Sequence, residues 1–227
     1  KAAGKRSATG YFRVEQIEDD TGSSGWHFIT PEGHLFWSLG ITGIRPKVFP
    51  ADVTLVEGFE YLFEELPARD GPYGSAYIDS TFSFYNWNIL RKYGDLDAWR
   101  EMAMKRLHAW GMNTVGNWSE KELIQQSTIP FTWSFRSGYN RWQHDVYDPA
   151  WAAYVDAVLS EASEFRDNPL LLGYFVDNES GWGHLDLLKR LPKDAYLRKE
   201  WGAYLEKRYG DIKNFSSHSG GDFTSWA

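Results

Sequence analysis

The chain has 227 residues, with 24 Lys and Arg against 31 Asp and Glu, so its formal net charge is −7 at pH 7. This negative charge, without a basic stripe, argues against a nucleic-acid backbone as a partner. The chain has no Cys, which excludes disulfides, thiolate metal sites and a cysteine nucleophile.

The aromatic content is high, with 12 Trp, 13 Tyr and 14 Phe. A core of this length does not need so many rings, so we expect some of them to line a cleft. Sugar rings present apolar C–H faces edged by hydroxyls, which suit stacking on aromatic side chains. The alternative is a heavily aromatic core.

No apolar run approaches the roughly 18 residues of a membrane span, and no signal peptide opens the sequence. We therefore expect a soluble protein without a membrane partner. We also expect it to be extracellular or periplasmic, as a mature form from which a leader has been removed.

Residues 1–10 are small, basic and patternless, which predicts a frayed terminus. Short strands are predicted at 11–16 and 26–29, followed by the turn Thr30-Pro31-Glu32-Gly33 of a hairpin. We interpret residues 1–33 as a tail and a β element that plugs the bottom of a barrel. Residues 35–41 are then the first barrel strand, within a catalytic region at 34–227.

A connection of about 70 residues, from Ile41 to Met112, is far longer than an ordinary βα loop. Helices are predicted at 57–66 and 82–93. An insertion after a first strand is expected to overhang the active face and shape the substrate site. The alternative is a peripheral elaboration.

The rest of the chain alternates between helices and strands. Asp97 is expected to cap one helix, Ser119 and Glu122 to form a capping box, and Asp148-Pro149 to begin a long helix. Strands are expected at 112–116, at 129–133 and from Leu170, a last helix at 194–209, and a loop-like tail at 214–227.

This count gives four βα units, or the first half of a (β/α)8 TIM barrel. A half barrel would leave two long sheet edges unpaired. We therefore expect a companion polypeptide, or residues absent from this sequence, to complete the barrel.

The fourth strand ends in Asp177-Asn178-Glu179. In a parallel barrel this end opens onto the rim where chemistry takes place. Cleavage of a glycosidic bond with retention needs a carboxylic acid for the leaving oxygen and a second carboxylate about 5–5.5 Å away. We assign the acid/base role to Glu179, desolvated by apolar neighbours such as Phe175, and sugar-hydroxyl binding to Asn178. The alternative is a loop whose acids cap the next helix.

Several other side chains are candidates for sugar binding. Asn113, Asn117 and Trp118 are expected at or just beyond the end of the second strand, and Trp133 and Trp182 follow later. Ordinary packing is the alternative for each of them.

Other chemistry is disfavoured. Glu120 and Glu122 are weak candidates for a nucleophile, because the capping box explains Glu122. His144, Asp145 and Asp148 could suggest a metal cluster, but Asp148 has its cap role, so we expect no metal. No phosphate cradle or dinucleotide fingerprint is present in the sequence, so no cofactor is expected.

Two segments carry a resemblance to a known family. Residues 110–119, WGMNTVGNWS, and 173–179, GYFVDNE, resemble glycoside hydrolase family 50, the β-agarases. Segments 33–40 and 82–94 are similar to that family too, and the likeness runs from about residue 11 to 210. The motif Asp-Asn-Glu alone is shared with the family 42 β-galactosidases. The segment Asn-Thr-Val-Gly-Asn-Trp is more specific for family 50.

The resemblance implies a (β/α)8 barrel and hydrolysis of the β-1,4 linkages of agarose with retention. It gives Glu179 the acid/base role and makes Asn178 its partner. The nucleophilic Glu of the family ends the seventh strand, which lies outside this chain. Activity is therefore expected to require the missing half of the barrel.

Two alternative functions remain open. One is a β-galactosidase-like hydrolase that acts on chain ends. The other is a non-catalytic protein that binds a polysaccharide through an aromatic groove.

Overall fold

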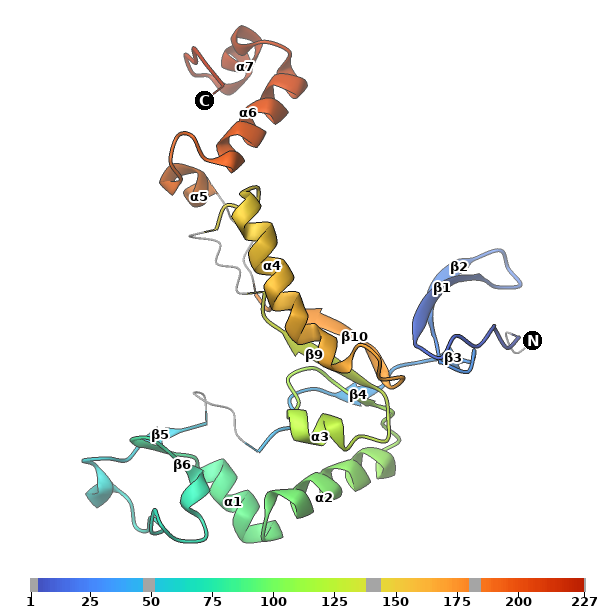
Figure 1. Cartoon of the computed structure of the whole chain (residues 1–227), viewed down its shortest axis with the longest axis vertical. Helices are drawn as coiled ribbons and strands as arrows, with labels where there is room; N and C mark the ends of the chain where they lie inside the picture. The colour runs from blue at the N-terminus through green and yellow to red at the C-terminus, as the bar shows by residue number, and fades with distance from the viewer. Residues whose placement is uncertain (1–3, 47–51, 138–143, 180–184, 227) are drawn as a thin grey trace. The chain divides into compact units, whose positions relative to one another are not determined.

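The computed structural model describes residues 4–46, 52–137, 144–179 and 185–226 (Figure 1). The chain forms two compact units. The first comprises Lys1–Trp133 and Asn168–Tyr174, and the second comprises Ser134–Asp167 and Phe175–Ala227.

The first unit begins with a small antiparallel sheet. Its strands β1 (Arg13–Glu18), β2 (Ser24–Ile29) and β3 (Leu35–Phe36) lie in the order β1-β2-β3. Gly33, in the turn between β2 and β3, has φ 91°, and a Cβ there would lie 2.0 Å from the Arg6 carbonyl oxygen. The turn needs glycine for both reasons, and the predicted hairpin is confirmed.

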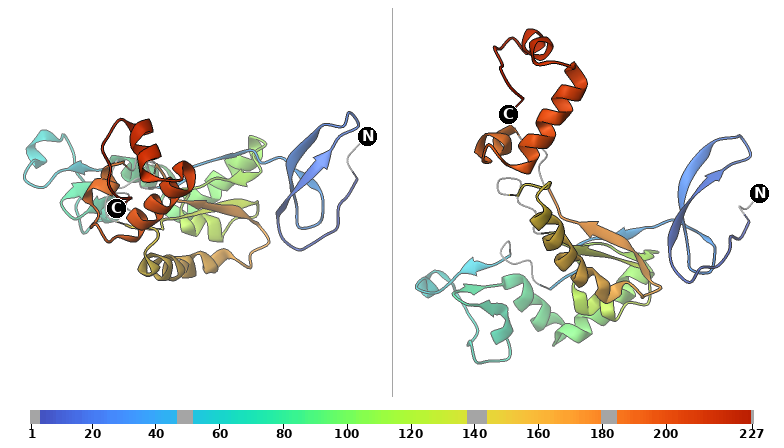
Figure 2. Two further views of the ribbon diagram at one scale, coloured as in Figure 1. Left: turned by 90° about the horizontal axis from the view of Figure 1, so that it is seen from above. Right: turned by 45° about the horizontal axis from the view of Figure 1, so that its top comes forward.

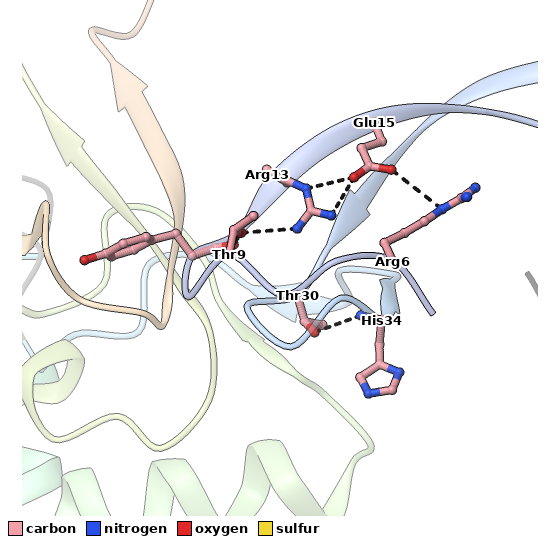
Figure 3. Close-up of polar contacts among 7 residues, drawn as sticks. Arg6, Thr9, Arg13, Glu15, Thr30 and His34 are labelled. Atoms are coloured by element: carbon pink, nitrogen blue, oxygen red, sulfur yellow. Dashed lines mark hydrogen bonds and ion pairs between the residues drawn. The ribbon is translucent and has the colours of Figure 1, made fainter. Parts of the chain in front are cut away.

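The segment before β1 is held against this hairpin (Figure 3). Arg13 donates from Nε to Glu15 at 2.8 Å and from Nη1 to Thr9 at 3.2 Å, and Arg6 Nε lies 3.6 Å from Glu15. The Arg6 N–H also donates to the Gly33 carbonyl at 2.8 Å. The prediction of a frayed terminus is therefore wrong for residues 4–10, and residues 1–3 lie outside the described part of the chain.

A parallel sheet follows, with strand order β10-β9-β8-β4. Its strands are β4 (Gly40–Ile41), β8 (Thr114–Val115), β9 (Phe131–Phe135) and β10 (Leu171–Val176). Gly40 pairs with Thr114, and Val115 pairs with Phe131, both in parallel. The expected α/β character and the four parallel strands are confirmed.

The predicted strand at 35–41 is wrong as a single element. Its first residues form β3 of the antiparallel sheet, and its last residues form β4 of the parallel sheet. Asn113 fixes the backbone between them, because its Nδ2 donates to the Trp37 carbonyl and its Oδ1 accepts from the Leu39 N–H, both at 2.8 Å.

The long insertion is a folded element with its own core. Its strands β5 (Thr54–Leu55), β6 (Tyr77–Ile78) and β7 (Thr81–Phe82) form an antiparallel sheet in the order β5-β7-β6, with a 3-10 turn, η2, at Gly74–Ala76. Its hydrophobic core is a cluster of the buried residues Val56, Ala76, Phe82 and Trp87. The second predicted helix is present as α1 (Phe84–Tyr93), capped by Ser83.

The other predicted helix of the insertion, at 57–66, is not formed. Only one 3-10 turn occurs there, η1 (Glu60–Leu62). Gly58 has φ 80°, and its N–H is taken by the Glu60 side chain at 3.1 Å. This positive φ interrupts the helical pattern that the apolar spacing indicated.

Two predicted caps are also corrected. α2 (Leu96–Ala109) is capped by Asp95, whose side chain accepts from Ala98 N, while Asp97 lies in its first turn. α3 (Lys121–Gln125) begins at Glu120 without a side-chain cap. Ser119 instead donates to the Gly116 carbonyl at 2.7 Å and accepts from Ile44 N at 3.2 Å, so the capping box is wrong.

The second unit is mostly helical (Figure 2). It holds α4 (Pro149–Ala162), η3 (Ser163–Phe165), α5 (Leu185–Arg190), α6 (Tyr196–Tyr209) and α7 (Ile212–Ser219). Asp148 caps α4 as predicted. The prediction of a loop-like tail is wrong for residues 214–219, because Asp211 caps α7 by accepting from Asn214 N and Gly220 ends it at φ 73°. Residues 221–226 form neither helix nor strand.

None of the helices in the described parts of the chain is long and apolar enough to cross a membrane.

Candidate active site

Strand β10 leads into the acidic motif. Tyr174, Phe175 and Val176, in its second half, are 39%, 49% and 55% exposed. The apolar end of the strand is therefore not covered by the described residues. Glu179 is exposed too, so its expected burial by Phe175 is not seen among these residues.

Asp177, the first acid after β10, is fully engaged. Its carboxylate accepts from the backbone N–H of Ser137 at 2.7 Å and from the Ser137 hydroxyl at 2.5 Å. Its own N–H donates to the Phe135 carbonyl at 3.0 Å. Asp177 thus ties the ends of β9 and β10 together, a positioning role that the sequence did not reveal.

Glu179, two residues later, is in the opposite situation. It is exposed, and no hydrogen bond or ion pair from the described residues holds its carboxylate. Asn178 beside it is likewise exposed. A carboxylic acid without a structural partner, on an anchored turn, is available to exchange a proton with a ligand.

The backbone of this turn is strained. Asp177 and Glu179 have φ 58° and 54°, in the left-handed region that non-glycine residues rarely adopt. Trp118, which follows β8 in the first unit, has φ 61°. Three of the four non-glycine residues with positive φ in the described chain therefore come just after a parallel strand. Such strain is concentrated at functional sites.

The turn after β8 holds two predicted sugar-binding residues. Asn117 is 5% exposed, and its carbonyl accepts from the Gly43 N–H at 2.9 Å. Trp118 is 44% exposed, so a large part of its surface faces solvent. The bonds of Ser119 to Gly116 and Ile44 hold this turn in place.

The remaining candidates are placed differently. Asn113 lies before β8 rather than beyond it, and its amide binds the backbone of Trp37 and Leu39. Trp133 lies within β9 and is half-buried. Trp182 lies outside the described residues.

Glu120 has a structural partner. It accepts from Arg100 at both oxygens, from Nε at 2.6 Å and from Nη2 at 2.8 Å. These bonds raise the pKa of Arg100 further above its ordinary value. Glu122 is exposed on α3.

The acids considered for a metal cluster bind backbone N–H groups. Asp145 accepts from Tyr147 N and Leu197 N, and Asp148 accepts from Ala150 N. Within the described ranges, no group of three His, Cys, Asp or Glu is arranged to hold a metal ion.

Comparison with known proteins shows which proteins the chain is similar to. No protein-family model matches the chain. It is 23% identical to β-agarase B of Vibrio sp. strain JT0107, over 98% of the chain and 29% of that protein. It is 24% identical to β-agarase A of the same strain, over 88% of the chain and 25% of that protein. The resemblance to the β-agarases is confirmed.

Solved structures of agarases have a matching fold. PfGH50B and the agarase AgWH50C each superpose with a TM-score of 0.79 at 24% identity, over 99% of this chain and 39% of theirs. An exo-β-agarase superposes with a TM-score of 0.74 at 24% identity, over 98% of this chain and 40% of its own. The chain therefore has the fold of about two fifths of these agarases, and it spans less than a third of the curated β-agarases.

Proposed function

We propose that this chain carries the acid/base side of the active site of a retaining glycoside hydrolase. The substrate is agarose or a related galactan, cut at its β-1,4 linkages. One observation carries the proposal: Glu179 stands without a structural partner among the described residues, on a strained turn that Asp177 anchors. The likeness to proteins named β-agarases supports the substrate.

In the first step of this reaction, Glu179 donates its proton to the leaving glycosidic oxygen while a second carboxylate attacks the anomeric carbon. A covalent glycosyl–enzyme forms and the shortened sugar chain leaves. In the second step, Glu179 accepts a proton from water, the water oxygen bonds to the anomeric carbon, and the second carboxylate is released. No cofactor or metal takes part in these steps.

The second carboxylate is proposed to come from outside these 227 residues. The four parallel strands supply the first half of a (β/α)8 barrel, and a companion polypeptide or further residues supply the rest. The much greater length of the relatives supports this arrangement. Glu120 is a poor substitute, because Arg100 holds both of its carboxylate oxygens.

Sugar binding is assigned to Asn178, Asn117, Trp118, Trp133 and Trp182. Asn113 is left out of this group because its amide is engaged with the backbone on both sides. A galactan is too large to enter a cell intact, so the protein is proposed to work outside the cytoplasm, in the periplasm or beyond the cell.

The acid/base role is tested by comparing cleavage rates on two substrates whose leaving groups differ in their need for a proton. Glu179→Gln is compared with Glu206→Gln, which changes an exposed acid on α6 in the same way. Glu179→Gln is expected to slow agarose cleavage by about 10²–10⁴-fold. It should spare the first step on an aryl glycoside whose phenolate leaves without protonation, measured as the initial burst of phenolate, because Glu179 is then needed only as the base of the second step.

Both rates are measured on material of known intact mass and chain content, so the source of the second carboxylate is identified. An equal loss in the initial phenolate burst and in agarose cleavage would contradict the acid/base role, as would unchanged cleavage of agarose. A chain that binds agarose and never cleaves it, even with the rest of a barrel supplied, would indicate a binding protein instead.

A further inference from the structure

A cavity of about 240 Å³ lies in the first unit, between the segment that follows β4 and one face of α2. Residues 41–45 form one side of this cavity and α2 forms the other, and Tyr85 of α1 also lines it. None of its described lining residues has a part in the proposed cleavage steps or in the proposed sugar binding. A ligand of this cavity is therefore distinct from the proposed substrate.

Arg45 lines the cavity and lacks an acceptor. Its Nε is buried without a hydrogen-bond partner, and no hydrogen bond or ion pair from the described residues reaches its guanidinium. A guanidinium keeps its proton, and it offers five N–H donors and no acceptor. A buried cationic donor without an acceptor costs free energy. A group that accepts hydrogen bonds and carries negative charge would remove that cost.

A second arginine lines the same cavity. Arg106, on α2, is half-buried and donates from Nη2 to the Tyr93 hydroxyl at 2.8 Å, which uses one of its five donors. Among the described residues that line the cavity none is acidic, although the whole chain has a net charge of −7. Two positive side chains without a negative one predict an anion as the ligand.

The walls of the cavity indicate which anion fits. Trp99 and Leu107 are 6% and 2% exposed and give the lining an apolar part, and Trp110 adds a second indole that is 59% exposed. The volume is below the roughly 300 Å³ at which the range of ordinary ligand pockets begins. Arginine binds both carboxylate and phosphate, but a phosphate ion would leave the apolar wall without a contact. A carboxylate on a short aliphatic stem suits both parts of the lining.

We propose that this cavity is a carboxylate site, in which Arg45 binds the carboxylate and the tryptophan-lined wall packs against its carbon stem. The group is either a small free carboxylic acid or the side chain of an Asp or Glu from the rest of the barrel. The second source is a segment beside β4, which is an edge strand of the described parallel sheet. Only this second source rests on the proposed function.

The test is a titration of the 227-residue chain with propionate, whose carboxylate and short stem match the proposed group, at constant ionic strength. Binding is followed by saturation-transfer NMR on the ligand protons and by the melting temperature. Propionamide, a neutral molecule of nearly the same shape, is the control ligand. Saturable binding of propionate without binding of propionamide is expected. Equal binding of both, no binding of propionate, or tighter binding of inorganic phosphate at the same site would overturn the inference.

The role of Arg45 is tested with Arg45→Gln. Its matched control is Arg166→Gln, which changes an arginine just after η3 that is 73% exposed and lies outside the cavity. Arg45→Gln is expected to weaken propionate binding about tenfold or more, because charge-assisted hydrogen bonds to the carboxylate are lost. Arg166→Gln should leave binding unchanged, and unchanged binding by folded Arg45→Gln would overturn the inference. Arg106→Gln is the second variant, with weaker binding again expected, if Arg45→Gln does not fold.

The source of the carboxylate is identified by repeating the titration on material that also contains the rest of the barrel. A side chain from that part fills the cavity and abolishes propionate binding, whereas a site for a free acid still binds propionate, and both results support a carboxylate site. The proposed function fails separately. The propionate titration of the 227-residue chain does not depend on whether Glu179→Gln changes the cleavage of agarose.

Discussion

Two acids two residues apart have opposite roles at the end of β10. The Asp177 carboxylate binds Ser137 and positions the turn, whereas the Glu179 carboxylate has no hydrogen-bond or ion-pair partner among the described residues. Both have left-handed backbones. The Asp177 bonds offset part of the cost of that conformation, which is of order 1–3 kcal/mol for each residue.

Asp177→Ala is predicted to destabilise the protein, because it removes both bonds from Ser137 and exposes the strained turn. The expected loss in free energy of unfolding is about 1–3 kcal/mol, measured by urea denaturation. Ser137→Ala should cost less, since the backbone N–H of residue 137 still donates to Asp177. Additive losses in the double variant would contradict this coupling.

At this scale, the sequence predicted where the acids lie but not which of them is free. The apolar run followed by Asp-Asn-Glu located the motif after a strand. The partner of Asp177 is Ser137, 40 residues away, and no local pattern pairs them. The structural role of Asn113 was missed for the same reason, because its side chain binds the backbone of residues 37 and 39, more than 70 residues away.

Among the elements, the pairing of β4 with β8 depends on one close approach. A Cβ on Gly40 would lie 2.1 Å from the Thr114 carbonyl oxygen, which belongs to the backbone of the neighbouring strand. The backbone of β8 cannot move aside without breaking the Gly40↔Thr114 pair. Glycine is required here for space rather than for its φ.

Gly40→Ala is predicted to destabilise the protein by about 1–3 kcal/mol or more, because it forces the two strands apart. Gly173→Ala is the matched control, since Gly173 also lies in a parallel strand and has nothing within 4 Å of the added Cβ. Thermal unfolding of both variants is the measurement. Equal melting temperatures for the two variants would contradict the close approach.

The junction of α2 and α3 depends on an ion pair. Arg100 and Glu120 side chains are 12% and 13% exposed and are joined by two hydrogen bonds. Glu120→Gln is predicted to lower the free energy of unfolding by about 1.5–3 kcal/mol, because charge-assisted bonds are lost. Exposed Glu122→Gln should be neutral.

The rate of agarose cleavage distinguishes this structural role of Glu120 from a role in catalysis. Glu120→Gln is expected to keep the agarose cleavage rate of the folded protein once stability is accounted for. A loss of rate in protein that is fully folded would reopen Glu120 as a nucleophile.

The sequence predicted helices and turns correctly where the residues that determine them are adjacent in sequence. The cap and proline of α4 and the hairpin turn at Gly33 are examples. The apolar spacing at 57–66 predicted a helix that is not formed, because Gly58 has φ 80°. The helix α7 was missed, although Asp211 caps it and Gly220 ends it. The sequence did not predict that residues 35–41 divide into β3 and β4. The strand that each part pairs with decides which sheet it joins, and for β4 this partner, β8, is far away in sequence.

For the whole molecule, the four parallel strands and the likeness to two fifths of solved agarases agree with each other. They support the proposal that the chain supplies one part of a larger catalytic barrel. The exposed end of β10, and Glu179 without a partner among the described residues, are consistent with that proposal.

The central claim is tested most directly by reducing-sugar release from agarose by the wild type and by Glu179→Gln, in material whose chain content is known from its intact mass. Release by the wild type is expected when the rest of the barrel is present, with a loss of about 10²–10⁴-fold in the variant. Equal release by the two proteins would contradict it.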